Sequence, residues 1–481
     1  MRKRRRVLLI TPPYHSGVVE AAGVWLNLAF VYLAGSLRVK GYEPIIYDAM
    51  SYWHGYEEIE KSILEVDPDV VVTTAITAAI VDALKVLKLA KRINPKIVTV
   101  IGNVHPTFCY EEILREHHEY VDYVVRGEGE VTLVELLEAV FNGGDVSKVK
   151  GIAYWEEGGV KVTPDRELIT DLDNLPTAWD LVDWSVYTYK PLEGSVLAVV
   201  SSSRGCSHHC AFCSQQLFWK RKWRARSPEN FVNELVNLRE KFGVNVVMIS
   251  DETPTLSRER WERILDLKIE KGLDTIILME TRVSDILRDR DIMWKYRKAG
   301  VEHIYVGVES VSQSTLELFK KNIRVEESKQ ALDIINEHDI ISETSFVLGM
   351  PDDTKETIKN CVELAKYYNP DLAFFLAITP WPYAEIYSEL KPYIEIWDYS
   401  KYNLVEPVVR TKEMSREELK EELFKATMEF YMHKMKSFGS MSSFKREFMI
   451  KVMKIIATDS YLSQTMKEIV VKKTKKFIKS K

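Results

Sequence analysis

The chain has 481 residues, which is enough for about three domains of roughly 150 residues each. Its 66 basic and 71 acidic residues give a net charge of −5, and this balance argues against nucleic acid as a main partner. The sequence has no apolar stretch long enough to span a bilayer, and its five cysteines lack disulfide-like spacing, so we expect a cytoplasmic protein in a reducing compartment.

Short apolar strands alternate with helices over the first 145 residues. This alternation predicts a flavodoxin-like domain, residues 1–145, with a doubly wound parallel sheet. The strands are expected at Val7–Thr11, Pro44–Tyr47, Val70–Thr73, Ile97–Ile101 and Tyr123–Val125. The helices are expected at Trp25–Lys40, Tyr56–Val66, Ala79–Ile93 and Val131–Phe141, with a short one after Pro106.

Doubly wound sheets bind ligands at the carboxyl ends of their strands, and those ends carry small, hydroxyl and glycine residues here. Such residues let a large ligand approach the backbone closely. The alternative is a domain of this fold that binds nothing or contacts a partner protein. The candidate binding residues are Thr11, Tyr14, Thr73, Thr74, Gly102, His105, Gly127 and Glu128.

Residues 146–190 are expected to connect two domains. Gly151–Trp155 and Val160–Thr163 flank a glycine-containing turn, which predicts a β-hairpin. An acidic, proline-punctuated segment then leads to Pro191. Segments of this kind usually form an ordered linker packed between domains.

Three of the five cysteines fall within eight residues, as Cys206, Cys210 and Cys213 in a C-x3-C-x2-C spacing. They follow an apolar run, Val196 to Val200, which predicts a buried strand with the cysteines on the loop after it. Three thiolates on one loop can hold three corners of an iron–sulfur cluster. The fourth iron would then lack a protein ligand, and an open metal position lets a substrate or cofactor bind directly.

A zinc site is the alternative for these cysteines, with His208 and His209 as further ligands. Both histidines lie between the cysteines, where the backbone would have difficulty directing both side chains inward. Zinc sites also usually draw a second ligand pair from another part of the chain. The spacing therefore favours a cluster. Cys109 and Cys361 are isolated, so we expect them to pack as small core residues.

Strands and helices alternate again through residues 191–380. Counting the strand before the cysteines, six βα repeats are expected, which are too few to close an eight-stranded barrel. We therefore expect a partial barrel, open on one side for a large substrate. Its later strands are expected at Val244–Ile249, Thr275–Met279, His303–Val308, Thr344–Leu348 and Leu372–Ile378.

Polar residues at the carboxyl ends of barrel strands are the usual site residues. The second barrel strand is followed by Asp251 and Glu252, and the sequence does not distinguish which of the two carboxylates acts. The other candidates at strand ends are Arg282, Glu309, Ser310 and Gly349.

Residues 381–481 are expected to form a mainly helical region that helps to enclose a substrate cavity. In the loop where this region begins, Pro380 and Pro382 fix the backbone next to Trp381 and Tyr383. The two aromatic side chains offer flat apolar faces, so they are candidates for the cavity wall. Equally, they could pack the C-terminal helices onto the barrel.

The cysteine spacing is that of the radical S-adenosylmethionine (SAM) enzymes, and the chain is identified as a member of that superfamily. The strand ends of the first domain, including the Gly-Glu-Gly-Glu run from Gly127, resemble the cobalamin-binding domain fused to one large group of these enzymes. Further segments resemble the anaerobic magnesium-protoporphyrin IX monomethyl ester oxidative cyclases and their relatives. These segments are residues 212–219, 251–255, 280–289, 379–383 and 397–403.

The resemblance implies three cofactors, namely a 4Fe-4S cluster on the three cysteines, SAM and cobalamin. It places Phe212 along the adenine of SAM and a carboxylate, Asp251 or Glu252, on the SAM ammonium group. Arg282 could bind a carboxylate in a bidentate way. Glu309 and Ser310 resemble the position that contacts ribose and methionine, and Gly349 would let the backbone approach the adenine.

Two features of the first domain depart from related motifs. The run from Gly102 to His105 is Gly-Asn-Val-His, whereas the related group has Gly-Gly-Pro-His. None of the ten histidines has an aspartate two residues before it, so the cobalt-ligating motif of the cobalamin mutases is absent from this sequence. Any bound cobalamin would therefore lack a cobalt ligand from that motif.

The implied function is a cobalamin-dependent radical SAM enzyme that functionalises an unactivated C–H bond of a large, largely apolar substrate, such as a tetrapyrrole or a lipid. Its expected partner is a reductant such as ferredoxin or flavodoxin. Cyclase-like oxidation and methyl transfer need the same cofactors, so both remain open. A non-catalytic corrinoid- or metal-responsive binding protein is the alternative of another class, and the polar residues at successive strand ends count against it.

Overall fold

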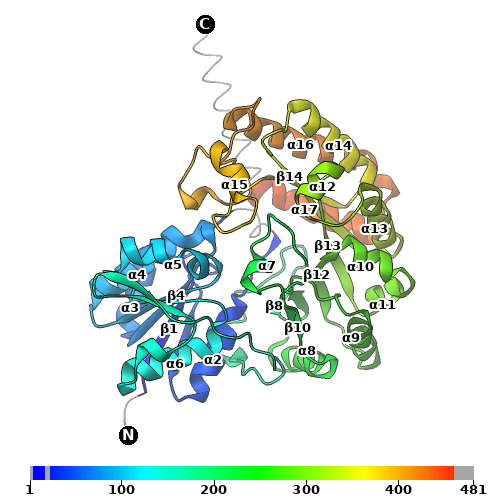
Figure 1. The fold of residues 1–481 in the computed structure, drawn as a ribbon. Helices are drawn as coiled ribbons and strands as arrows, with labels where there is room; N and C mark the ends of the chain where they lie inside the picture. The colour runs from blue at the N-terminus through cyan, green and yellow to red at the C-terminus, as the bar shows by residue number, and fades with distance from the viewer. Residues whose placement is uncertain (1–3, 17–21, 460–481) are drawn as a thin grey trace.

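The computed structural model describes residues 4–16 and 22–459, and it contains two large sheets in two lobes (Figure 1). The first lobe, blue to cyan in Figure 1, has a seven-stranded sheet with helices on both faces. The second lobe, green to red, has a six-stranded sheet followed by further helices. The mixed α/β class and the order of the two units are those predicted.

The first sheet has the strand order β2-β1-β3-β4-β5-β6-β7. Its first five strands are parallel and the order reverses at β1, which confirms the predicted doubly wound topology. The central strands are apolar on both faces because helices cover both sides. The strands are β1 (Arg6–Ile10), β2 (Glu43–Tyr47), β3 (Val70–Thr74), β4 (Val98–Gly102), β5 (Tyr123–Val125), β6 (Ile152–Glu156) and β7 (Gly159–Val162).

The helices of the first lobe form two layers, one on each face of the sheet. The helix predicted from Trp25 begins instead at Leu28, and the short helix predicted after Pro106 is longer. Pro106 lies in the first turn of that helix, where the missing N–H of proline costs no hydrogen bond. The helices are α2 (Leu28–Val39), α3 (Tyr56–Val66), α4 (Ile80–Ile93), α5 (Val104–His117) and α6 (Gly129–Asn142).

The predicted hairpin forms as β6 and β7, and it extends the first sheet. Strand β6 pairs antiparallel with β5, so that Val125 lies opposite Ile152. Glu157 and Gly158 between the two strands both have positive φ, as a two-residue hairpin turn requires. The hairpin therefore belongs structurally with the first lobe.

The second sheet has six parallel strands in the order β15-β14-β13-β12-β11-β8. Strands β8 and β15 are its two edges, which makes it the open partial barrel predicted from the repeat count. A small antiparallel pair, β9 (Ser203–Arg204) and β10 (Arg224–Ala225), flanks the cysteine loop. The six strands are β8 (Leu197–Val200), β11 (Val246–Ile249), β12 (Ile276–Arg282), β13 (Val301–Glu309), β14 (Ile341–Leu348) and β15 (Leu372–Ala377).

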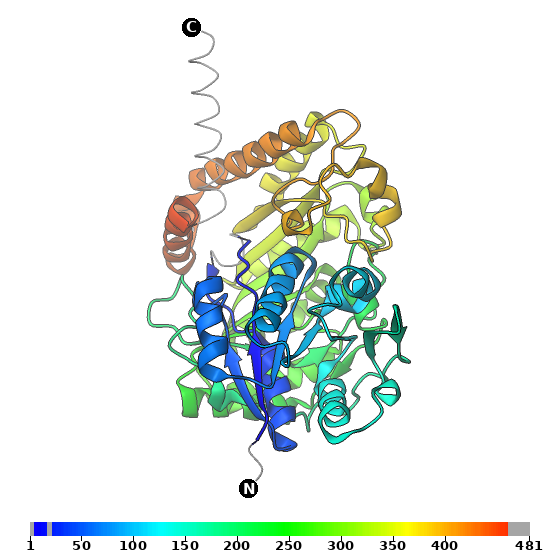
Figure 2. The same ribbon diagram turned by 90° about the vertical axis from the view of Figure 1, so that its left-hand side faces the viewer.

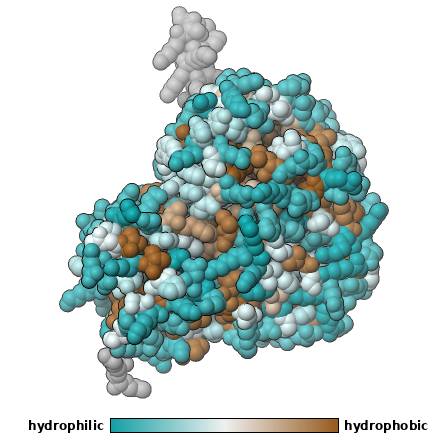
Figure 3. Space-filling view, viewed as in Figure 1, coloured by the Kyte–Doolittle hydropathy of each residue, from teal (hydrophilic) through white to brown (hydrophobic). Residues whose placement is uncertain are grey.

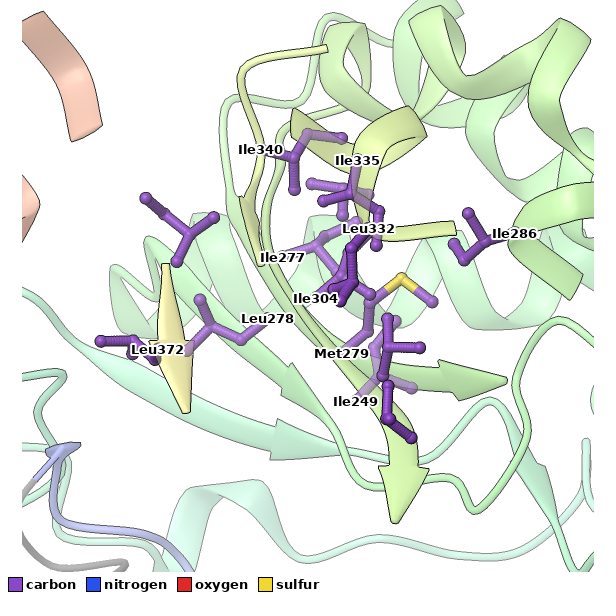
Figure 4. Close-up of a cluster of buried hydrophobic side chains, with 14 of the residues drawn as sticks. Ile249, Ile277, Leu278, Met279, Ile286, Ile304, Leu332, Ile335, Ile340 and Leu372 are labelled. Carbon is purple, nitrogen blue, oxygen red and sulfur yellow. The ribbon is translucent and has the colours of Figure 1, made fainter. Parts of the chain in front are cut away.

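Helices pack on the outer face of this sheet. Figure 4 shows Leu332 and Ile335 of α13 on that face, whereas Leu278 and Leu372 point to the opposite, inner face. Alternation along each strand therefore separates a core face from a face that lines the barrel interior. The helices are α7 (Gln215–Phe218), α8 (Pro228–Phe242), α9 (Arg258–Glu270), α10 (Val283–Arg288), α11 (Met293–Lys298), α12 (Gln313–Leu318), α13 (Val325–Glu337) and α14 (Lys355–Tyr368).

The C-terminal region consists of α15 (Tyr387–Leu390), α16 (Arg416–Lys436) and α17 (Ser443–Asp459). Helix α16 starts where the sequence predicts, because Ser415 accepts the N–H of Glu418 and donates its own N–H to the Glu418 carboxylate. Both long helices lie beside the yellow-green strands of the second sheet (Figure 2).

The face of the molecule in Figure 3 is largely hydrophilic, with apolar residues in small separate patches. Within residues 4–16 and 22–459, no helix is both long enough and apolar enough to cross a bilayer. The Lys-rich end of the sequence lies outside the described residues.

Candidate functional site

The cysteine loop leaves the second sheet after β8 and β9 and begins at Gly205. Gly205 has φ of +93°, and a Cβ there would lie 2.1 Å from the carbonyl oxygen of Lys222. Only glycine fits both the positive φ and this close approach of two backbone segments. The sequence before Cys206 therefore fixes the direction in which the cysteines leave the strand.

The two carboxylates after β11 hold the start of this loop. Asp251 is 1% exposed and accepts hydrogen bonds from Ser202 N at 2.8 Å, Ser202 Oγ at 2.5 Å and Ser203 Oγ at 2.7 Å. Glu252 accepts from Gly205 N at 2.9 Å and from Trp219 Nε1 at 2.5 Å. Burial raises the pKa of both carboxyl groups above their usual range.

Two of the cysteine sulfurs receive hydrogen bonds from side chains. Thr253 Oγ1 donates to Cys206 Sγ at 3.4 Å, and Arg282 Nη1 donates to Cys210 Sγ at 3.8 Å. Burial, together with the neighbouring thiols of Cys210 and Cys206, raises the pKa of Cys213 to about 12. A bound iron would therefore be needed to favour the thiolate form of Cys213.

This donor set fits an iron–sulfur cluster, because three thiols on one loop and hydrogen bonds to sulfur are what such clusters use. In the described part of the chain, no three His, Cys, Asp or Glu side chains are grouped as ligands of one metal ion. The expected approach of Cys206, Cys210 and Cys213 around a shared cluster therefore stays a prediction.

A buried ion pair that the sequence did not reveal lies beside Arg282. Lys321 Nζ donates to Glu309 Oε1 at 2.7 Å, and the Lys321 carbonyl accepts from Arg282 Nη2 at 2.8 Å. A Cβ on Gly307 would lie 2.6 Å from both Glu309 Oε1 and Lys321 Nζ, so a larger residue there would displace the ends of this ion pair. Lys321 follows a helix rather than a strand, and no strand-end rule could have selected it.

Glu280 is a second residue that was not among the candidates, although it directly follows the strand predicted to end at Met279. It lies two residues before Arg282 on β12, so both side chains face the barrel interior. Burial and the nearby carboxylates of Glu252, Asp251 and Glu309 raise the pKa of Glu280 to about 8. At neutral pH its carboxyl group therefore carries a proton and can donate a hydrogen bond.

This pKa predicts a pH-dependent stability in the cofactor-free protein. The folded state keeps a proton on Glu280 that the unfolded chain releases above about pH 4.5. The free energy of unfolding should therefore fall as pH rises from about 4.5 to 8, by at most about 5 kcal/mol, and then level off. Glu280→Gln should remove this part of the slope in thermal melts between pH 5 and pH 9.

The matched control for that experiment is Glu337→Gln, which changes an exposed glutamate at the end of α13 in the same lobe. It should leave the pH dependence of melting as it is in the wild-type protein. Equal slopes for wild type and Glu280→Gln would contradict the assignment of a protonated Glu280.

The remaining predicted residues of the second lobe have local structural partners. Ser310 Oγ accepts the N–H of Ser312 at 3.1 Å. Gly349 has φ of +93° and donates its N–H to Asp353 Oδ2 at 2.8 Å. The ring of Phe212 packs against Phe319, with 4.9 Å between the ring centroids.

A crevice of about 250 Å³ lies between the lobes, at the carboxyl ends of β3, β4 and β5. Helix α2 supplies an apolar wall, and small residues leave the backbone accessible, which fits the approach of a large flat ligand. Its predicted first-lobe residues are Thr73, Thr74, Gly102, Gly127 and Glu128. Its second-lobe residues are Ser201, Ser203, Arg204, Phe218, Trp219, Ser250 and Glu252.

Three predicted first-lobe residues lie outside the lining of this crevice. Thr11 is buried and donates to Asp48 Oδ1 at 2.7 Å, while Tyr14 is half-buried farther along the same loop. His105 is buried beside Thr77, with 3.1 Å between Nδ1 and the Thr77 hydroxyl, and burial lowers its pKa to about 4. The neutral His105 ring therefore belongs to the packing between the lobes, where it contacts the rings of Tyr383 and Tyr399.

Glu128 connects the two lobes through a buried ion-pair network. Its Oε1 accepts from Arg204 Nη1 at 2.9 Å, and its Oε2 accepts from Arg224 Nη1 at 2.9 Å and from Ile169 N at 2.7 Å. Glu130 Oε1 lies 2.7 Å from Arg204 Nη2. Since Arg204 directly precedes Gly205, the Gly-Glu-Gly-Glu run is tied to the root of the cysteine loop.

The structure places Tyr383 at the interface between the lobes and Trp381 against the second lobe. Tyr383 stacks on Phe108 with 4.8 Å between ring centroids, and its hydroxyl lies 2.8 Å from Thr77 Oγ1. Trp381 packs against an apolar cluster that contains Ile378 and Ile386. The Tyr383 side chain thus packs the loop after β15 onto the first lobe.

Comparison with known proteins agrees with this architecture. Residues 14–137 match the B12 binding domain, and residues 200–365 match the Radical SAM superfamily. The chain is 37% identical to the anaerobic magnesium-protoporphyrin IX monomethyl ester cyclase of Rubrivivax gelatinosus, over 89% of this chain and 78% of that one. It is 32% identical to an uncharacterized methyltransferase of Pyrococcus horikoshii, PH0819, over 89% of this chain and 93% of that one.

Among solved structures, the radical SAM methyltransferase TsrM of Kitasatospora setae, with tryptophan substrate and a SAM analogue bound, has a similar fold. The TM-score is 0.67 at 19% identity, over 80% of this chain and 76% of that chain. The two domain matches confirm the predicted cofactors, which are cobalamin, SAM and a 4Fe-4S cluster. The chain belongs to the cobalamin-binding (B12) radical SAM enzyme family.

Proposed function

We propose that this enzyme oxidises an unactivated C–H bond of a large, largely apolar substrate, in the manner of an anaerobic oxidative cyclase. The observation that carries the proposal is the crevice between the lobes, whose far wall includes Arg204 and Glu252 at the root of the cysteine loop. A reaction that uses cobalamin and SAM together needs both to reach one space that excludes water. The relative named as a magnesium-protoporphyrin cyclase makes a tetrapyrrole the first substrate to test.

In this proposal, Cys206, Cys210 and Cys213 hold the cluster, and Thr253 and Arg282 donate hydrogen bonds to two of its sulfur ligands. When bound, the reduced cluster and SAM supply the one-electron chemistry that removes hydrogen from carbon. The hydrogen bond from Arg282 Nη1 holds the Cys210 sulfur in position as a cluster ligand.

Glu252 is the carboxylate that we assign to the SAM ammonium group, because Asp251 is enclosed and already accepts three hydrogen bonds. Glu309 and Ser310 are assigned to the ribose and methionine parts of SAM, with Phe212 and Gly349 near the adenine. The role of Lys321 is then to hold the Glu309 carboxylate in place.

Residues Thr73, Thr74, Gly102 and Gly127 are assigned to cobalamin, because they line the crevice at the strand ends. Asn103 is assigned to cobalamin as well, although it replaces the second glycine of the related Gly-Gly-Pro-His motif. It also lines the crevice and donates to Thr74 Oγ1 at 2.8 Å, which orders the crevice wall.

We further propose ferredoxin or flavodoxin as the reductant and the cytoplasm as the location. The five cysteines, free in this structure, suit a reducing compartment, and a small electron carrier is the simplest one-electron donor.

The proposal is tested by anaerobic reconstitution of the full chain with iron, sulfide and cobalamin. The reduced protein is incubated with magnesium-protoporphyrin IX monomethyl ester and with SAM that carries a deuterated methyl group. We expect deoxyadenosine together with an oxidised tetrapyrrole that lacks the label. The absence of both products from protein loaded with all three cofactors would contradict a cyclase-like function.

Methyl transfer is the second candidate, because the Pyrococcus relative that the chain covers almost completely is named as a methyltransferase. The same incubation distinguishes the two reactions. A product that carries the deuterated methyl group would support methyl transfer and exclude oxidation as the main reaction on that substrate.

A further inference from the structure

A second and larger cavity, of about 450 Å³, lies on the inner face of the six-stranded sheet. It is walled by strands β11 to β15, by α16 and α17, and by residues 22–26. Its walls are mainly apolar, and its size is within the roughly 300–1,000 Å³ of small-molecule pockets. Representative lining residues are Met248, Leu278, Phe374, Leu376, Leu423 and Phe424.

One wall of this cavity carries a polar group of three side chains. Tyr189 Oη lies 3.2 Å from His303 Nδ1, and His303 Nε2 lies 2.7 Å from Glu343 Oε2. All three residues line the cavity, His303 and Glu343 from the amino-terminal halves of β13 and β14 and Tyr189 from the segment before β8. An otherwise apolar pocket with a few convergent polar groups orients a ligand by those groups.

Tyr305 is the lining residue on β13 that lies nearest along the strand to Glu309, which is assigned to SAM. The nearby Glu309, Glu280 and Glu343 all raise the pKa of the Tyr305 hydroxyl, after burial as the main cause. From His303 to Glu309 the strand advances by roughly 20 Å. A ligand that extends from the cofactors to His303 must therefore be long as well as apolar.

We propose that this cavity binds the apolar body of the substrate, with a hydrogen-bond donor of the substrate on the Glu343 carboxyl group. The inference rests on the proposed function and adds where the substrate lies and which of its features are recognised. The shared chemistry is a largely apolar body, either a tetrapyrrole ring or a long lipid chain, whose polar end carries an O–H or N–H donor. Its reacting carbon lies on the Tyr305 and Glu280 side, toward the cofactors.

The test measures binding by fluorescence, with 1-aminoanthracene as an uncharged apolar probe and the full chain loaded with iron, sulfide and cobalamin. Leu423→Trp places a larger side chain in the cavity from α16 and should weaken probe binding at least tenfold. The matched control is Met428→Trp on the same helix, where the side chain is 37% exposed and lies outside the cavity lining. This control should leave the affinity unchanged.

A second variant keeps the proposal testable if Leu423→Trp fails to fold. Anthracene has the same ring system as the probe but no amine, so wild-type protein should prefer 1-aminoanthracene by about tenfold. Glu343→Leu removes the carboxyl group and should abolish this preference. An unchanged preference, or equal weakening of the probe by Leu423→Trp and Met428→Trp, would overturn the proposal.

Competition then identifies the substrate class. Displacement of the probe by magnesium-protoporphyrin IX monomethyl ester supports a tetrapyrrole, and displacement by hexadecanol alone supports a lipid chain. Displacement by neither would overturn the proposal that this cavity is the substrate site. Probe binding needs neither SAM nor reductant, so a failure of SAM cleavage contradicts the proposed function without changing these results.

Discussion

Replacing Cys210 with alanine should abolish the reductive cleavage of SAM and lower bound iron well below the about four atoms per chain of a complete cluster. Cys210 is buried, its sulfur receives the Arg282 hydrogen bond, and its carbonyl accepts the N–H of Cys213. Loss of one thiolate leaves the cluster with two protein ligands. The measurements are iron content and deoxyadenosine formation after anaerobic reconstitution, and the same result is expected for Cys206 and Cys213.

Cys361→Ala is the matched control, because Cys361 is a buried cysteine on α14 that packs in the core. This variant should lose a little stability and keep its iron and its SAM cleavage. Deoxyadenosine formation that persists in Cys210→Ala at the level of the control would contradict the cluster assignment.

The architecture and the cofactor set followed from sequence because they depend on local patterns. The apolar strands of both sheets, the capped start of α16 and the cysteine spacing are each encoded within a few neighbouring residues. The partner of each strand, by contrast, depends on hydrogen bonds between residues that lie far apart in the sequence. The hairpin β6–β7 was predicted correctly as a hairpin, but its pairing with β5 depends on contacts with a strand some thirty residues earlier.

The candidate site was only partly predictable for the same reason. Strand ends indicate which residues lie at the correct edge, and Thr73, Thr74, Gly102 and Glu252 do line the crevice. Strand ends cannot show which side chains are already engaged. The Asp251 carboxylate accepts hydrogen bonds from two serines that lie 48 and 49 positions earlier in the chain. Only the folded structure reveals these contacts.

Residues whose importance comes from charge pairing were missed altogether. Lys321 lies beyond a helix and faces the site only because the chain folds back toward Glu309. Glu280 directly follows the predicted end of its strand and opens the 280–289 segment, but its raised pKa arises from burial and from three carboxylates on other segments. Alternation along β12 was a further available signal, since it places Glu280 on the same face as Arg282.

Glu128→Gln should weaken the attachment of the first lobe to the cysteine loop. The Glu128 carboxylate is buried and neutralises two buried arginines, Arg204 and Arg224, from the other lobe. Removing one partner of a buried ion pair typically costs about 3 kcal/mol or more, because the opposite charge is left without compensation. We therefore expect a lower melting temperature, weaker retention of cobalamin, and SAM cleavage that is less well coupled to product formation.

The exposed Glu57 on α3 of the same lobe provides the matched control, as Glu57→Gln. Its melting temperature and cobalamin content should equal those of wild type. A double-mutant cycle with Arg204→Met then separates a specific pair from a general loss of stability, because the double variant should lose less than the sum of the two single variants. Strict additivity in melting temperature and cobalamin content would mean that Glu128 and Arg204 act independently. The buried network would then be a feature of packing, and the position of the cysteine loop would not depend on it.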